Sequence, residues 1–311
     1  MTQPPDPQAP KRRPRIGYAR YALLTVPARR TAQLWRLALG VLLVFAIMFG
    51  MTQGIMTMLG TVLPAETFDR MTRALAIGDT PAGLLGMLVS MGAMGLAAFT
   101  VVEIVHDRRP ASLVGPWPLA RRQFWDVLFA LVALNAVLMI LPPWGLFEGT
   151  VPGLSLGHWL ALLPLTLIAL FIQTGSEELL FRGYLQSQLA ARFKHPAVWL
   201  IVPSLVFGLG HYAPEIYGGN AWLVVIWAVI YGIASADLTA RAGTLGPAVA
   251  MHLVNNFLAM GLVSMQGDMS GLALRLLPFG PEAQGEVLSL LPIDLASILV
   301  SWLAARIAIR A

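Results

Sequence analysis

Long apolar runs separated by short polar connections make up most of this chain, and the length of the runs sets the expected architecture. A helix needs about 20 mostly apolar residues to cross the hydrocarbon of a bilayer. The last run is the weakest candidate because Pro292 and Asp294 lie near its start. Strands are not expected within the runs, since open strands leave backbone groups unpaired in lipid. The pattern predicts an all-α, polytopic transmembrane helical bundle of about eight spans, at residues 38–60, 81–103, 124–144, 156–176, 196–212, 221–239, 244–265 and 288–308.

The composition favours a membrane protein and excludes several other classes. Hydrophobic residues make up 57% of the 311 residues and charged residues only 12%, with a mean hydropathy of +0.70. These values are far from those of soluble domains. The absence of cysteine excludes disulfides and thiolate metal sites. The net charge is +5, but the basic residues lie in separate connections rather than along one stripe, so no nucleic-acid partner is expected.

The distribution of Lys and Arg predicts how the bundle is oriented. Basic residues concentrate in alternate connections, such as 104–123 and 182–194, whereas 143–157 and 212–220 contain none. Connections rich in Lys and Arg stay on the cytoplasmic side of a membrane. We therefore expect a multi-pass protein of the cell membrane with both its N- and C-termini in the cytoplasm.

Two regions differ in composition. Residues 1–32 are rich in Pro and Arg with little apolar clustering, and they are predicted to form a disordered basic cytoplasmic tail. Residues 33–311 are predicted to form the transmembrane helical domain. His106 and His195 fall in basic connections, where solvated or interfacial positions are expected.

Polar residues inside the apolar runs are few, and they gather in three short stretches. Nothing between Glu148 and Glu177 carries a formal charge, and Glu177 is then followed by Glu178 and Arg182. An ionisable group at membrane depth is costly to keep and marks a functional site by default. The other two stretches are Phe207-Gly208-Leu209-Gly210-His211 and His252-Leu253-Val254-Asn255-Asn256.

The spacing of these residues predicts that they converge on one centre. Glu177 and His211 lie 17 residues before and 17 residues after Lys194, where the chain is expected to turn between two helices. Equal lengths on the two arms of a helical hairpin return the side chains to nearly the same height. His252 and Asn256 are four residues apart, so they share one helix face. The depth of this centre in the bilayer stays open, with a cavity toward the cytoplasm favoured.

In order, the three stretches read EExxxR, FxxxH and HxxxN, and together they resemble the CAAX-protease and bacteriocin-processing family of intramembrane endopeptidases. This family is also called CPBP or Abi and includes the type II CAAX prenyl endopeptidases. The resemblance covers a catalytic core at about 156–262, with every motif position filled. It implies that Glu177 polarises a water molecule together with His211. It also implies that His252 and Asn256 stabilise the oxyanion of the tetrahedral intermediate.

Neighbouring residues are expected to support this centre. Glu178 and Arg182 are four residues apart on one face, and we interpret them as an ion pair that orients the catalytic helix. Phe207 is interpreted as a packing residue that positions the imidazole one turn away. Asn255 could also reach the shared centre, but the family spacing favours Asn256.

The sequence leaves more than one alternative for the cofactor, for the substrate and for whether the protein is catalytic. No cofactor is favoured, but a zinc ion held by Glu177, His211, His252 and a water is a chemically reasonable alternative, although the sequence has no HExxH. The expected partners are membrane lipid and a peptide or membrane-anchored protein substrate, either prenylated or bearing a leader. The alternative functions are a non-catalytic membrane scaffold or immunity protein of the same family and, less favoured because no paired repeat is visible, a small-solute transporter.

Overall fold

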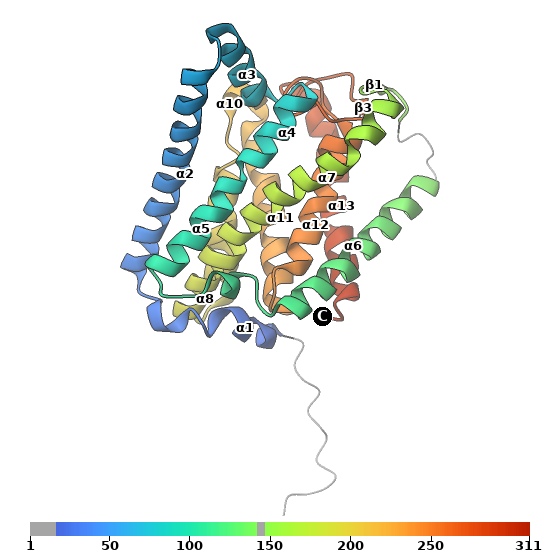
Figure 1. The fold of residues 1–311 in the computed structure, drawn as a ribbon. Helices are drawn as coiled ribbons and strands as arrows, with labels where there is room; N and C mark the ends of the chain where they lie inside the picture. The colour runs from blue at the N-terminus through green and yellow to red at the C-terminus, as the bar shows by residue number, and fades with distance from the viewer. Residues whose placement is uncertain (1–16, 142–146) are drawn as a thin grey trace, which may run out of the picture.

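The computed structural model describes residues 17–141 and 147–311, which form a mainly helical bundle (Figure 1). Six segments are long and apolar enough to cross a membrane: α2 (Leu34–Val62), α4 with α5 (Pro81–Ser90, Gly92–Ile104), α6 (Trp117–Ile140), α7 with η4 and α8 (Leu156–Glu178, Leu179–Gln186, Ser187–Arg192), α10 with η5 and α11 (Pro214–Tyr217, Gly218–Asn220, Ala221–Ala242), and α13 (Gln284–Ala308). The other helical elements are shorter: η1 (Tyr18–Tyr21), α1 (Ala22–Thr25), η2 (Arg29–Thr31), α3 (Ala65–Ile77), η3 (Pro110–Leu113), α9 (Pro196–Leu209), α12 (Gly246–Asn256) and η6 (Phe257–Leu262). The chain is therefore a multi-pass membrane protein.

The expected count of about eight spans is not confirmed. The runs predicted at 196–212 and 244–265 do form helices, but α9 has 14 residues and α12 has 11. Both are shorter than the roughly 20 residues that a bilayer requires. The last run, despite Pro292, forms a continuous helix of 25 residues and meets the criterion.

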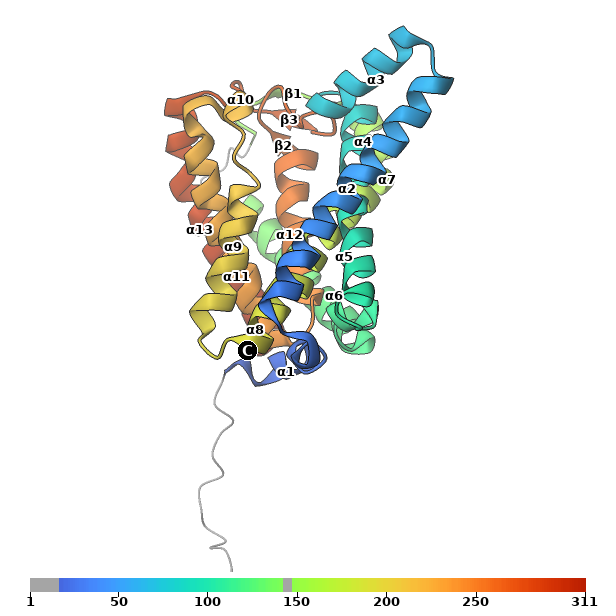
Figure 2. The same ribbon diagram turned by 90° about the vertical axis from the view of Figure 1, so that its left-hand side faces the viewer.

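Helix α12 lies inside the bundle between two groups of helices. On one side α11 packs against α9, α12 and α13, and on the other side α7 packs against α4, α5 and α12. Figure 2 shows α12 between these groups, and α7 crosses the bundle obliquely in Figure 1. The helical turns that begin the described chain and the C-terminus lie at the same end of the bundle (Figures 1 and 2).

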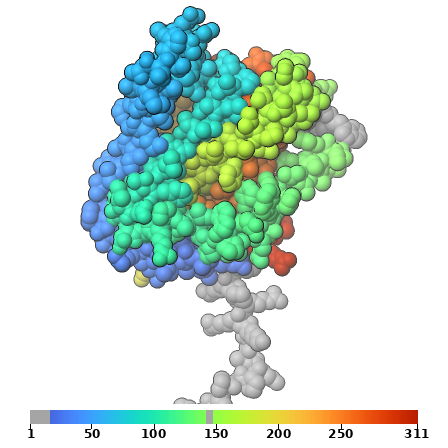
Figure 3. Space-filling view, viewed as in Figure 1, coloured from blue at the N-terminus to red at the C-terminus, as the bar shows by residue number. Residues whose placement is uncertain are grey.

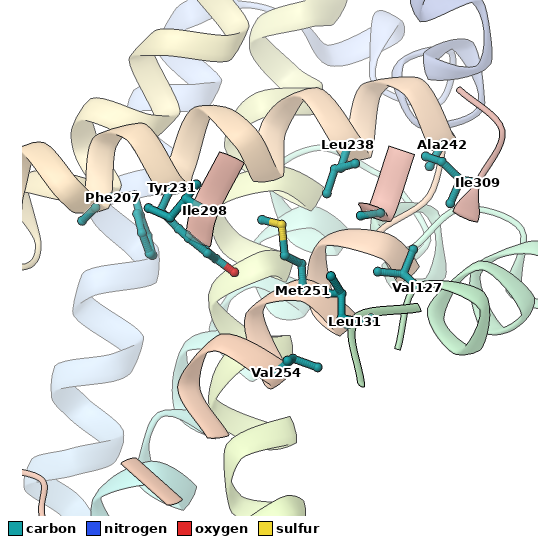
Figure 4. Packing of buried hydrophobic residues seen from close by; sticks show 13 residues of the cluster. Val127, Leu131, Phe207, Tyr231, Leu238, Ala242, Met251, Val254, Ile298 and Ile309 are labelled. Carbon is teal, nitrogen blue, oxygen red and sulfur yellow. The ribbon is translucent and has the colours of Figure 1, made fainter. Parts of the chain in front are cut away.

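The buried core that surrounds α12 is aliphatic and aromatic. Met251 and Val254 of α12 pack against Leu131 of α6, Tyr231 of α11 and Ile298 of α13 in one cluster (Figure 4). Side chains packed this closely interdigitate and leave few voids. They therefore hold the residues of α12 at defined positions relative to α6, α11 and α13.

A small sheet ties together the connections at the opposite end of the bundle. Its strands are β1 (Val151–Pro152), β2 (Val263–Ser264) and β3 (Arg275–Leu276), in the order β1-β3-β2. Strand β3 pairs antiparallel with β1 and parallel with β2. The strands lie in connections outside the apolar helices. Unpaired strand edges are costly only within lipid, so short strands are tolerated there.

The start of the described chain is folded, unlike the disordered tail expected over residues 1–32. Residues 17–31 form short helical turns in which Tyr21 and Leu24 are buried against Leu189 of α8 and Trp199 of α9. The Tyr18 hydroxyl donates a hydrogen bond of 2.7 Å to Asp237 of α11. Aromatic and apolar residues spaced by three along these turns supply a buried face that the Pro- and Arg-rich composition obscured. Residues 1–16 lie outside the described residues.

His106 is buried rather than solvated as expected, because it joins three segments. Its side chain is 1% exposed, with Nδ1 donating to the Thr31 carbonyl at 3.1 Å and Nε2 accepting from the Tyr184 hydroxyl at 2.8 Å. This assignment keeps the ring neutral. Burial lowers the pKa of His106 from 6.5 to about 4.

Acidification is therefore expected to destabilise the fold through His106. Between pH 6.5 and about 4 the unfolded histidine binds a proton that the folded one does not, so stability present above pH 6.5 is lost as the pH falls through this window. Since a change of one in pKa corresponds to about 1.4 kcal/mol, the loss is at most about 3 kcal/mol. Apparent melting temperatures in detergent should converge for wild type and His106→Gln as the pH falls. For wild type and His195→Gln, the melting temperature should instead fall in parallel as the pH is lowered. A melting temperature of His106→Gln that also falls in parallel with that of wild type would contradict the prediction.

Candidate active site

A buried ion pair anchors the helix that carries the two adjacent glutamates. Glu178 and Arg182 are 0% and 1% exposed, and Arg182 Nη1 donates to Glu178 Oε1 at 3.0 Å. Arg182 Nη2 also donates to the Gly232 carbonyl of α11 at 3.3 Å, and its guanidinium lies 4.6 Å from the centre of the Phe207 ring. The predicted ion pair is thus present, and it fixes the junction of α7 and η4 against α9 and α11.

His252 of α12 bridges both glutamates of α7. Its Nδ1 lies 2.9 Å from Oε1 of Glu178, and its Nε2 lies 3.5 Å from Oε2 of Glu177. The imidazole is 4% exposed and packs against the Tyr231 ring, whose centre is 5.2 Å away. Two carboxylates, the guanidinium of Arg182 and the imidazole that contacts both carboxylates thus form one buried cluster. Buried charged groups are kept where such partners are present.

Gln173 is a part of the site that the sequence interpretation missed. Its Nε2 donates to Glu177 Oε1 at 2.7 Å, and its Oε1 accepts from Asn256 Nδ2 at 2.8 Å. The only available signal was its position four residues before Glu177, which places both on one helix face. Gln173 thereby joins α7 to the end of α12 and holds one oxygen of Glu177.

His211 stands further from this network than the other predicted residues. It lies in the turn just after the end of α9 at Leu209, where its Nδ1 bonds to the Phe207 carbonyl at 2.9 Å. Its ring packs on that of Phe207 with 4.6 Å between centroids, and the Phe207 ring in turn lies 6.1 Å from that of His252. The Phe207 ring therefore contacts both imidazoles, and its role in positioning that of His211 stays a prediction.

The asparagine pair occupies the end of α12. Asn255 donates through Nδ2 to Oδ1 of Asn256 at 3.2 Å, while Asn256 bonds to Gln173. Asn256 therefore belongs to the network directly, and Asn255 belongs to it through Asn256. The structure brings together Glu177, Glu178, Arg182, His252 and Asn256, and it joins His211 to them through Phe207.

The three-ligand zinc alternative, with Glu177, His211 and His252, stays a prediction. Within the described part of the chain, no group of three or more His, Asp or Glu side chains is placed to hold a metal ion. Glu178 engages Nδ1 of His252, and the Phe207 carbonyl engages Nδ1 of His211.

The site is closed on one side and partly open on the other. Glu177 is 6% exposed, whereas Asn256 and His211 are only half-buried. Oε2 of Glu177 has no hydrogen-bond partner among the described residues, although it is buried. Figure 3 shows atoms of the α12 segment, in orange, between α7 and α6 on one face of the bundle. The arrangement is thus an anchored carboxylate with one oxygen able to accept a hydrogen bond.

Comparisons with known proteins agree with this assignment of the motifs. Residues 157–258 match the family model described as type II CAAX prenyl endopeptidase Rce1-like, a range that contains all three motifs. The chain is 30% identical over 113 residues to the uncharacterized protein YyaK of Bacillus subtilis (strain 168). That match covers 36% of this chain and 38% of the relative, less than half of either. No solved structure matches significantly. The resemblance to the CAAX-protease family is confirmed over the matched range.

Proposed function

We propose that this CAAX-protease-type membrane protein is an intramembrane endopeptidase in which Glu177 activates a water molecule for attack on a peptide bond. The observation that carries the proposal is the asymmetry of the Glu177 carboxylate. Gln173 holds Oε1, while Oε2 is buried, 3.5 Å from Nε2 of His252, and free of hydrogen bonds within the described residues. A carboxylate oriented in this way meets the geometric requirement for a general base.

The reaction uses groups that the site already orients. Glu177 takes a proton from water, the resulting hydroxide attacks the carbonyl carbon, and the same proton then passes to the leaving amine nitrogen as the C–N bond breaks. The tetrahedral oxyanion needs hydrogen-bond donors aimed at it. Asn256 and His211, on the half-buried side of the site, are the donors available there.

His252 fits best beside the water rather than among the oxyanion donors. Its Nε2 is the nitrogen nearest to Oε2 of Glu177, and its Nδ1 is fixed by Glu178. A carboxylate on one ring nitrogen sets the orientation of the imidazole and which nitrogen faces the substrate. This division of roles exchanges the two histidines relative to the assignment that the family resemblance implied.

Gln173 is proposed as a positioning residue. Gln173→Leu should lower the rate of hydrolysis about 10–100-fold, because a hydrogen bond to a charged group contributes about 1.5–3 kcal/mol. The Gln173→Glu variant, which places a third carboxylate next to Glu177, should be at least as impaired. Rates on a cleaved substrate, compared with melting temperatures, check the prediction. Full activity of Gln173→Leu would exclude the positioning role.

The substrate is proposed to be a membrane-associated peptide or protein, either prenylated near its C-terminus or carrying a leader. Quantitative proteomics of cells expressing wild type or Glu177→Gln should reveal an uncut precursor that accumulates only with the variant. Glu215→Gln, which removes an exposed carboxylate outside the site, is the matched control. A phenotype that Glu177→Gln leaves intact would instead support the scaffold or immunity function.

Orientation is part of the same proposal. The N-terminal turns and the C-terminus lie at one end of the bundle (Figure 1), where basic residues such as Arg192 and Arg306 also lie near helix ends. By the positive-inside rule this end faces the cytoplasm. Accessibility labelling of residues at the two ends in intact cells tests the assignment.

A further inference from the structure

Two neighbouring cavities, both wide open to the surface, lie where the N-terminal segment meets the end of α8, away from the glutamates. The larger, of about 510 Å³, is lined by Arg29, Trp35 and Arg192 among others. The smaller, of about 230 Å³, is lined by Arg29 and Lys194 among others. Arg29 borders both, and no acidic residue lines either. We refer to the two together as the basic cavities.

The positive charges of the basic cavities are not neutralised by the protein. Arg29, Arg192 and Lys194 are exposed, and none forms an ion pair with a carboxylate among the described residues. Arg30, directly next to Arg29, shows the contrast because it pairs with Asp107. Unpaired basic side chains that line a concave surface create a local positive potential that attracts anions.

A buried arginine adds a further charge behind the smaller cavity. Arg108 is 4% exposed and donates to Ser187 Oγ at 3.2 Å, but its Nε and Nη2 have no hydrogen-bond partner in the part of the chain that the structure describes. It interacts electrostatically with Tyr21, which lines that cavity. Burial lowers the pKa of Arg108 to about 10, so it remains charged at neutral pH.

The basic cavities lie at the level where lipid headgroups begin. The apolar span of α2 starts at Leu34 and the span that includes α8 ends at Arg192, and both residues line the larger cavity. Trp35, 62% exposed, stands beside them. Tryptophan concentrates at the boundary between hydrocarbon and headgroups. A ligand here therefore meets basic groups on one side and the edge of the hydrocarbon on the other.

We propose that the basic cavities bind the phosphate headgroup of an anionic phospholipid from the leaflet that borders the N-terminal segment. Arginine donates paired hydrogen bonds that match phosphate oxygens, and a cavity of about 510 Å³ has the size of a small-ligand site. A lipid is favoured over free phosphate because the site adjoins the ends of two spans.

The test uses the full chain reconstituted in nanodiscs of phosphatidylcholine and phosphatidylglycerol, followed by detergent extraction and native mass spectrometry. Wild type should retain phosphatidylglycerol in preference to phosphatidylcholine. The Arg29→Gln/Arg192→Gln variant should retain roughly 25-fold less, since each basic residue near an anionic surface contributes roughly a fivefold factor. Lys194→Gln should lose roughly fivefold, by the same reasoning.

The matched control removes the same charge elsewhere. Arg109→Gln/Arg121→Gln neutralises two exposed arginines outside the basic cavities and should keep the bound lipid. Melting temperatures show whether each variant is folded. If the Arg29→Gln/Arg192→Gln variant is not, the single exposed substitution Lys194→Gln tests the proposal instead. Equal losses in both double variants would assign binding to diffuse surface charge and overturn the proposal. Equal retention of phosphatidylcholine, or displacement by inorganic phosphate, would overturn it as well.

Discussion

Glu177→Gln protein is expected to hydrolyse its substrate about 10²–10⁴-fold more slowly than wild type, the usual contribution of a positioned general base. Glutamine has nearly the shape of glutamate, so the bond to Gln173 on the Oε1 side can be kept. What is lost is the basic oxygen beside Nε2 of His252, which wild type provides at 3.5 Å. The change removes the proton acceptor rather than the structure around it.

Single-turnover rates on the precursor identified by proteomics measure this effect, with the melting temperature recorded in parallel. Glu286→Gln, which alters an exposed carboxylate at the start of α13, should leave the rate unchanged. A slow rate combined with an unchanged melting temperature supports the role of Glu177. If Glu177→Gln retained the wild-type rate while folded, water activation by this carboxylate would be wrong.

Arg182→Met is expected to cost about 3–5 kcal/mol of unfolding free energy, the range for removing one partner of a buried ion pair. The substitution leaves Glu178, 0% exposed, without its cation 3.0 Å away. It also removes the donor that meets the Gly232 carbonyl at 3.3 Å. The variant then keeps the two buried carboxylates without the guanidinium that pairs with Glu178.

Unfolding titrations in mixed micelles, performed on paired variants, separate charge from packing. Glu178→Gln/Arg182→Met removes both charges and should recover a large part of the loss, because no unpaired ion remains. Arg122→Met, in an exposed pair with Asp126, should change stability by less than about 1 kcal/mol. A double variant as unstable as Arg182→Met alone would point to lost packing on Phe207 instead.

Much of the fold follows from hydropathy because lipid permits few alternatives to helix. The Glu178–Arg182 pair was predictable from a spacing of four residues, which α-helices bring together on one face. The meeting of Glu177 with Asn256 through Gln173 was only partly predictable. Gln173 is uncharged, and its role depends on how α7 and α12 are rotated relative to each other, which is a tertiary property.

Other features depended on contacts that composition hides. Tyr18 and Tyr21 anchor a segment whose Pro and Arg content resembles that of a disordered tail. Buried His106 has partners in Thr31, Tyr184 and Gln188, all far from it in sequence. The sequence also did not predict that α12 has only 11 residues, because its apolar run continues into the π-helical η6.

The near-complete enclosure of Glu177 and His252, at 6% and 4% exposed, has a kinetic consequence for a protease. In the proposed reaction, a peptide has to reach the buried Oε2 of Glu177 from the half-buried side formed by Asn256 and His211, which requires the surrounding helices to move. Motions of packed helices take microseconds to milliseconds or longer, and such steps limit turnover in many enzymes. We therefore expect the pace of cleavage to follow bilayer thickness and fluidity more closely than the reactivity of the scissile bond.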